Sequence, residues 1–143
     1  MNDFGLHFHH LGLAVRESTS AVVFLKGLGY SIGETVFDEI QNVSLILCSS
    51  LSGPSVEIIC PSPKPGLLDK VVQTHPTGLV YHVCYSSNDL RASLASITSA
   101  GLHTTCVSPS KPAILFTGSS VSFYQIAGIG LVEIVESKTR EYG

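Results

Sequence analysis

The sequence predicts an α+β fold in which paired βαβββ modules form a cup-shaped mixed β-sheet with flanking helices. Three observations lead to this prediction. The order strand, helix, glycine occurs twice at the same spacing, a Val-Glu-Ile strand closes each copy, and the intervening segments carry the period-two alternation of strands. Together they indicate a duplicated unit and not a chain of unrelated elements.

The duplication is clearest at two histidine-bearing strands and two glutamate-bearing strands. His10 to Gly29 spans 19 residues, and His82 to Gly101 spans 19 as well. His10 to Glu57 spans 47 residues and His82 to Glu133 spans 51. The matching segments are, in order, FHHLGLAV (8–15) with VYHVCYSS (80–87), and SVEIIC (55–60) with LVEIVE (131–136). Two matches in the same order, with His and Glu in register, predict a structural repeat.

Each repeat contains one predicted helix after its first strand. In the first repeat the apolar segment 21–30 follows Ser18 and Ser20, either of which is suited to the helix N-cap, and Gly27 or Gly29 ends it. In the second repeat Asn88 or Asp89 is the N-cap and Gly101 is the stop. Leu90, Leu94 and Ile97 stand at positions i, i+4 and i+7, which lie on one face of a helix and make that face apolar.

The remaining apolar segments predict strands and one crossover helix. Residues 66–73, preceded by Pro65, predict a helix between the repeats, next to the Ser/Pro-rich stretch 61–66. Branched and aromatic residues predict strands at 42–48, 54–60, 113–118, 120–127 and 130–136. We therefore expect a single domain over residues 1–143, built of modules at about 8–60 and 80–136.

Composition excludes several classes of protein. With 44% hydrophobic and 13% charged residues, the chain has the material for a packed core. A net charge of -3 gives no basic footprint for nucleic acid or an anionic membrane. The N-terminus lacks a signal-peptide pattern, and the four cysteines form no CxxC pair, so we expect reduced thiols and a cytoplasmic protein.

Four residues in repeat register, His10, Glu57, His82 and Glu133, predict one divalent cation site. Both glutamates stand mid-strand between branched apolar residues, and a buried carboxylate is rare unless it is paired or ligated. Symmetric pairing of the modules would direct all four side chains into a common cavity. Two imidazoles with two carboxylates suit Zn, Ni, Co or Mn.

Other potential ligands have simpler explanations. His7 and His9 lie near the N-terminus and are expected in solvent, and His9 points away from His10 if the strand has begun there. We expect His75 in a loop and His103 on the surface. Cys84 would be part of the cavity wall and not a nucleophile.

With these residues in place, the sequence resembles the vicinal oxygen chelate superfamily, which includes glyoxalase I, extradiol dioxygenases and bleomycin resistance proteins. The similarity covers about residues 8–136 and is strongest to methylmalonyl-CoA epimerases. The matching segments are HHLGLAV with ligand His10, VEIICP with Glu57, VYHVCY with His82, KPAILF (111–116), and GLVEIVE with Glu133. Of these, the superfamily motifs are more specific than those of the epimerases.

The resemblance implies a metal-dependent isomerase or epimerase that removes a proton next to a carbonyl chelated by the metal. Glu133 would be both ligand and catalytic base. The substrate would be a small molecule such as an acyl-CoA thioester, and the protein would be a homodimer. The alternatives are a lactoylglutathione lyase of the glyoxalase I type and a non-catalytic binding protein.

The chain departs from the epimerase pattern at two places. Thr117, Gly118 and Ser119 stand where that family commonly has His-Pro-Lys. Leu45 stands where some relatives carry an acid proposed for the second proton transfer. The nearest acidic replacements are Glu34, Asp38 and Glu39. Because of the difference at 117–119, the resemblance does not identify the substrate. Because of Leu45, it does not identify the residue for the second proton transfer.

Overall fold

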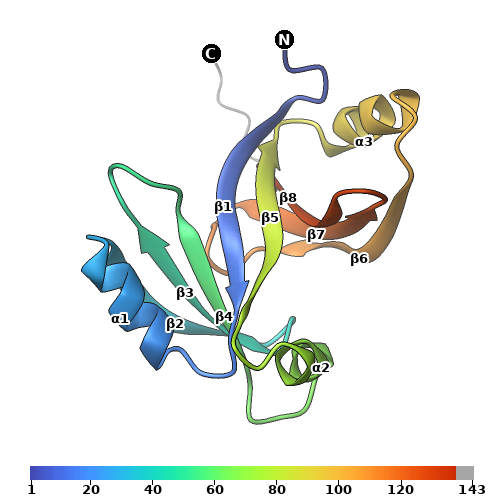
Figure 1. Ribbon diagram of the computed structural model, residues 1–143. Helices are drawn as coiled ribbons and strands as arrows, with labels where there is room; N and C mark the ends of the chain where they lie inside the picture. Colours follow the sequence, from blue (N-terminus) through green and yellow to red (C-terminus); the bar gives the residue numbers. More distant parts are fainter. Residues whose placement is uncertain (138–143) are drawn as a thin grey trace. The chain divides into compact units, whose positions relative to one another are not determined.

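The computed structural model describes residues 1–137 and confirms the α+β class (Figure 1). The strands are β1 (Leu6–Ala14), β2 (Ser31–Asp38), β3 (Val43–Ser49), β4 (Val56–Pro61), β5 (Leu79–Ser87), β6 (Thr104–Pro112), β7 (Ser119–Ile126) and β8 (Gly130–Ser137). The helices are α1 (Thr19–Gly27), α2 (Leu67–Thr74) and α3 (Leu90–Ser99). No helix within the described part of the chain is long and apolar enough to span a membrane.

The chain divides into two compact units with the same topology. The first unit is residues 10–81, and the second combines residues 1–9 with the described residues 82–137. Strand order is β2-β3-β4-β1 in the first unit and β5-β8-β7-β6 in the second. In each, the strand before the helix pairs in parallel with the last strand, and all other pairs are antiparallel. The predicted pair of βαβββ modules is confirmed.

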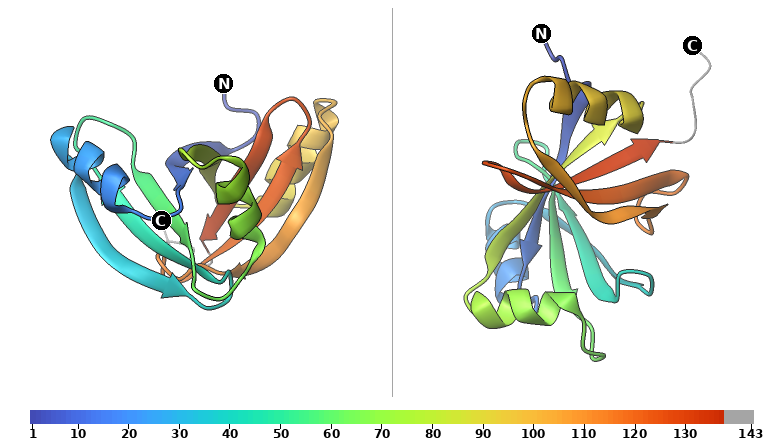
Figure 2. Two further views of the ribbon diagram at one scale, coloured as in Figure 1. Left: turned by 60° about the horizontal axis from the view of Figure 1, so that its bottom comes forward. Right: turned by 90° about the vertical axis from the view of Figure 1, so that its right-hand side faces the viewer.

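In each unit a helix covers one face of the sheet (Figure 2). Leu25 of α1 packs against β3 and β4 in the first unit. Leu90 and Leu94 of α3 pack against β7 and β8 in the second. The buried residues of these two cores are Leu25, Ile46, Cys48, Val56 and Ile58, and then Tyr124, Ile126, Val132 and Ile134.

This arrangement decides which way the glutamates point. Glu57 lies between Val56 and Ile58, and Glu133 between Val132 and Ile134, so both glutamates face away from the helix-covered side. The same alternation takes His10 and His82 to the glutamate-bearing faces, because Gly12 pairs with Glu57 and Cys84 with Glu133.

The helix ends follow the predicted signals. Ser18 is the N-cap residue of α1, although its side chain makes no capping hydrogen bond. Asp89 caps α3 by accepting a hydrogen bond from the Ala92 amide at 3.1 Å. Gly29 and Gly101 follow the two helices with φ of 91° and 88°, a conformation that glycine adopts at low cost.

The prediction of a strand at 113–118 is wrong. This segment is the turn that joins β6 to β7, and the Ala113 amide donates a hydrogen bond of 3.1 Å to the Ser119 carbonyl oxygen across it. The actual strand, β6, contains Pro109 and Pro112, which disfavour a strand in the sequence and are tolerated because β6 is the last strand of its unit's sheet. The prediction also missed β2, the corresponding edge strand of the first unit.

Candidate metal centre

The first unit brings His10 and Glu57 together. They lie on the parallel strands β1 and β4, where Glu57 pairs with Gly12, two residues beyond His10. The His10 Nε2 atom is 3.8 Å from the Glu57 Oε1 atom. His10 is fully buried and Glu57 is 4% exposed. This imidazole and this carboxylate are therefore a close pair that water barely reaches.

The second unit repeats the arrangement with His82 and Glu133. They lie on the parallel strands β5 and β8, and Glu133 pairs with Cys84, again two residues beyond the histidine. The His82 Nε2 atom is 3.1 Å from the Glu133 Oε1 atom. Both residues are buried. The register that the sequence repeat predicted is thus the same in both units.

The donor atoms of each pair fit a shared metal ion. Ligand atoms bound at about 2.1 Å to one ion lie roughly 3.0 Å apart at a right angle and at most roughly 4.2 Å apart. The distances of 3.1 and 3.8 Å fall within that range. The 3.8 Å separation in the first pair is too long for a hydrogen bond. Nitrogen and oxygen donors in this combination suit Zn, Ni, Co or Mn.

Aromatic and apolar side chains surround the second pair. Phe123 of β7 pairs with Glu133 in register, and its ring meets the His82 ring edge-on at 5.4 Å. Cys84 is fully buried in a cluster with Val121 and Val135. Sequence reasoning did not identify Phe123, since only the strand register shows that it lies beside Glu133.

The loop that was predicted as a strand packs onto this same cluster. Ala113 is buried against Cys84, Val121 and Val135, with Phe116 beside it. The Phe116 ring also meets the His9 ring edge-on at 4.7 Å. His9 is therefore half-buried, and the expectation that it lies in solvent is wrong.

Leu45 and the acids considered for a second proton transfer differ in their surroundings. Leu45 lies on the same face of the first unit's sheet as Glu57, because Leu47 pairs with Glu57 and alternation carries over to Leu45. Asp38 is buried, and its carboxylate accepts hydrogen bonds from the amides of Ile40 and Gln41 and from the Gln41 side chain. These hydrogen bonds hold the turn between β2 and β3.

Glu34 lies at a β-bulge in β2. Ile32 pairs with Cys48 and Thr35 with Ile46, so the two residues 33 and 34 face Leu47 alone. Such a bulge contains one extra residue, so that two consecutive residues lie opposite one partner residue. Glu34 is thereby directed toward the Glu57 face and away from the apolar core under α1, and it is exposed.

Comparison with protein families matches residues 9–123, more than half of the chain, to the model of the glyoxalase/bleomycin resistance protein/dioxygenase superfamily. No curated protein sequence matches the chain.

Among solved structures, methylmalonyl-CoA epimerases are similar in fold. The enzyme from Mycobacterium tuberculosis is 20% identical, with a TM-score of 0.71 over 94% of this chain and 89% of that one. A second methylmalonyl-CoA epimerase is 15% identical, with a TM-score of 0.75 over 97% of this chain and 100% of that one. A variant of the Streptomyces coelicolor enzyme, in complex with 2-nitronate-propionyl-CoA, is 20% identical with a TM-score of 0.68 over 93% and 98%. At these identities the likeness establishes a common fold.

Proposed function

The chain belongs to the glyoxalase/bleomycin resistance protein/dioxygenase superfamily, and we propose that it is a metal-dependent isomerase or epimerase that removes a proton next to a carbonyl group. One observation carries the proposal. Each unit holds a buried His–Glu pair on the sheet face that its helix leaves uncovered, and both pairs have the same register. A duplicated pair of this kind suits one site supplied equally by two modules.

In this proposal His10, Glu57, His82 and Glu133 bind a single divalent cation, Zn, Ni, Co or Mn. The cation balances two carboxylates that would otherwise be buried at a cost of several kcal/mol each. When bound, such an ion acts as a Lewis acid that polarises a substrate carbonyl oxygen. The four side chains hold the ion and leave room for substrate oxygens.

Glu133 is the catalytic base in this scheme. Its Oε1 atom lies 3.1 Å from the His82 Nε2 atom, and the residue is 4% exposed between its register partners Cys84 and Phe123 on the two neighbouring strands. Glu133 would take the proton from the carbon next to the carbonyl and return it.

Inversion at that carbon needs a second acid on the opposite side of the substrate. Leu45 carries no proton to transfer, and Asp38 is engaged in its turn. Glu39 lies in the exposed turn after β2 and not on a strand of the sheet. Glu34 is left as the acid on the Glu57 face of the first unit, and we assign the second proton transfer to it.

The substrate in this proposal is a small acyl compound, an acyl-CoA thioester being the type that a similar structure contains. We also propose that the chain forms a single domain and a homodimer, to be checked by light scattering of the purified protein.

The first experiment measures metal content. Protein purified without chelator is analysed by elemental mass spectrometry beside His82→Ala and, as a matched control, His75→Ala, whose exposed imidazole lies at the end of α2. We expect about one divalent ion per chain in the wild type and the control, and loss of the ion in His82→Ala. A wild-type protein that stays metal-free after addition of Co, Ni, Mn or Zn would contradict the proposal.

Metal-loaded protein is then given stereochemically pure methylmalonyl-CoA in deuterated water. Deuterium incorporation reports proton removal, and loss of optical purity reports inversion. A hemithioacetal of glutathione is assayed in parallel. Turnover of the hemithioacetal alone would indicate a lyase, and binding without turnover of either would indicate a binding protein.

A further inference from the structure

The two His–Glu pairs have the same strand register, but one neighbouring position differs between the units. In the first unit, Glu57 is the register partner of Leu47 on β3. In the second unit, Glu133 is the register partner of Phe123 on β7. The duplication therefore places an aliphatic side chain at this position in one unit and an aromatic ring in the other. The His–Glu distance is 3.8 Å beside the aliphatic side chain and 3.1 Å beside the ring.

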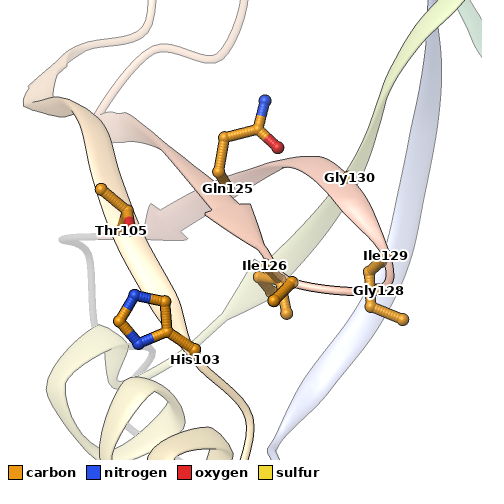
Figure 3. A pocket seen from close by; sticks show the side chains of 8 residues that line it. His103, Thr105, Gln125, Ile126, Gly128, Ile129 and Gly130 are labelled. Carbon is orange, nitrogen blue, oxygen red and sulfur yellow. The ribbon is translucent and has the colours of Figure 1, made fainter.

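Strand alternation brings the Phe123 side chain to the sheet face that carries Glu133. Ile126 belongs to the apolar core under α3, so Gln125 and Phe123 face the other way. Figure 3 shows Gln125 and Ile126 projecting to opposite sides of β7. The hollow of about 380 Å³ drawn there lies at the hairpin end of the strand, and Phe123 does not line it. The Phe123 ring is therefore part of the surroundings of the His–Glu pair.

The Phe123 ring meets the His82 ring edge-on. The ring centroids are 5.4 Å apart and the ring planes make an angle of 81°, a T-shaped arrangement that aromatic pairs favour. The two residues lie on β7 and β5, so the rings meet across β8, the strand that carries Glu133. The last torsion of a histidine side chain is soft and roughly two-fold. A half-turn about it would put a ring carbon of His82 where the Nε2 atom now lies, and the Phe123 ring opposes that rotation.

We propose that Phe123 is a positioning residue, whose ring holds the His82 imidazole with its Nε2 atom toward Glu133. This half of the proposed metal site is then formed before an ion binds. A donor that is already oriented loses less freedom on binding, so the affinity for the ion is higher. Leu47 has no ring, and the effect belongs to the second unit. The inference rests on the proposed function, because it concerns the metal affinity of His82.

The first test measures the Kd for Co²⁺ by competition with a chelator. Phe123→Leu removes the ring and makes the position the same as in the first unit, whereas Phe123→Tyr keeps the ring. Phe8→Leu is the matched control, because it removes another edge-on contact of the same unit, that with Tyr85 at 6.3 Å. We expect Phe123→Leu to weaken Co²⁺ binding about three- to tenfold, the size of one such contact. Phe123→Tyr and Phe8→Leu should bind Co²⁺ as the wild type does.

A second test uses metal-free protein and reports the orientation of His82 directly. Ring carbons of isotope-labelled histidine are followed by NMR relaxation, and the His82 signal is identified by its absence in His82→Ala. We expect the order parameter of the His82 ring to fall in Phe123→Leu and to keep its wild-type value in Phe123→Tyr and Phe8→Leu. General loosening of the fold would lower it in Phe8→Leu as well.

Two results would overturn the inference. One is an unchanged order parameter of the His82 ring in Phe123→Leu. The other is a loss of Co²⁺ affinity of the same size in Phe123→Tyr and Phe123→Leu, because the ring would then not be its cause. Failure of the proposed function is seen separately, as wild-type protein that binds no Co²⁺. The measurement on metal-free protein still decides whether Phe123 orients His82 in that case.

Discussion

Two buried glutamates are the residues from which the function follows. Glu57 and Glu133 are each 4% exposed and lie in strands whose neighbouring residues belong to apolar cores. A carboxylate in such a place must be paired, because removing its charge from water is costly. Each one has a histidine at 3.8 or 3.1 Å. Because burying these charges is costly, we expect a bound cation that balances them.

Replacing Glu133 separates proton removal from folding. We expect Glu133→Gln to lower solvent deuterium exchange at the substrate's acidic carbon by ~10²–10⁴-fold, because the amide cannot accept the proton. The variant should still fold, as judged by circular dichroism. Glu39→Gln, an exposed acid of the β2–β3 turn, serves as control and keeps full exchange. Undiminished exchange in Glu133→Gln would remove this residue from the base role.

At the scale of single elements, the bulge in β2 decides where Glu34 points. Gly33 lies so close to β3 that an added Cβ would be 2.5 Å from the Leu47 carbonyl oxygen, so only glycine fits there. Without the extra residue, alternation from Ile32 would place Glu34 in the core under α1. The bulge therefore gives an acidic side chain to the Glu57 face.

The second acid is tested by comparing exchange with inversion. We expect Glu34→Gln to retain deuterium exchange, because Glu133 still removes and returns the proton on its own side. Inversion should fall by ~10²-fold or more, since the acid on the other side is missing. Both are measured on the same metal-loaded sample by mass spectrometry and polarimetry. Equal losses of exchange and inversion would mean that Glu34 does not act as a separate proton donor.

In the second unit a hydrogen bond links α3 to β8, the strand that carries Glu133. The Glu136 Oε2 atom accepts a hydrogen bond of 2.7 Å from the Leu90 amide, the first residue of α3. A negative charge there also interacts favourably with the helix dipole. β8 thus positions Glu133 on one face and holds α3 through Glu136.

Removal of this contact should cost stability. For Glu136→Ala we expect a loss of about 1–2 kcal/mol in the free energy of unfolding, from the lost hydrogen bond and dipole interaction. Urea unfolding of metal-free protein measures it. Glu39→Ala, a surface substitution outside any helix terminus, should change the free energy by less than about 0.5 kcal/mol. Equal effects in the two variants would show that Glu136 does not hold the helix.

For the whole molecule, buried thiols make stability depend on pH. Burial raises the pKa of Cys48 above its ordinary value of 9.0, against a smaller lowering by a hydrogen bond to the Gly33 backbone. Burial also raises the pKa of Cys60, and the nearby Glu17 charge adds to this effect. Below pH 9.0 the thiols are neutral in both states. Above it, the unfolded chain releases its protons first, which favours unfolding.

We therefore expect the free energy of unfolding to fall as the pH rises through and above 9.0. Urea unfolding across this range measures the slope. Cys48→Ala should flatten it, although the variant loses some core packing at every pH. Cys106→Ser, at an exposed position, should leave the slope unchanged. A slope that is the same in Cys48→Ala and wild type would contradict this source of pH dependence.

Sequence alone determined the duplicated βαβββ plan and the residues of both His–Glu pairs. It could do so because strand alternation and repeat spacing are local properties of the chain, and both survive unchanged in the register of β1 with β4 and of β5 with β8. The N-cap at Asp89 and the stop at Gly101 are equally local.

Tertiary structure alone decided the edge strands and the surroundings of the site. β2 and β6 contain glycine, charged residues and proline, and they are strands only because a neighbouring strand supplies their hydrogen bonds. The apolar segment 113–118 looks like a strand, but it is a turn whose side chains pack against Cys84. The position of Phe123 beside His82 depends in the same way on strands distant in sequence. Pairing between strands is a long-range interaction, and no local pattern of residues specifies it.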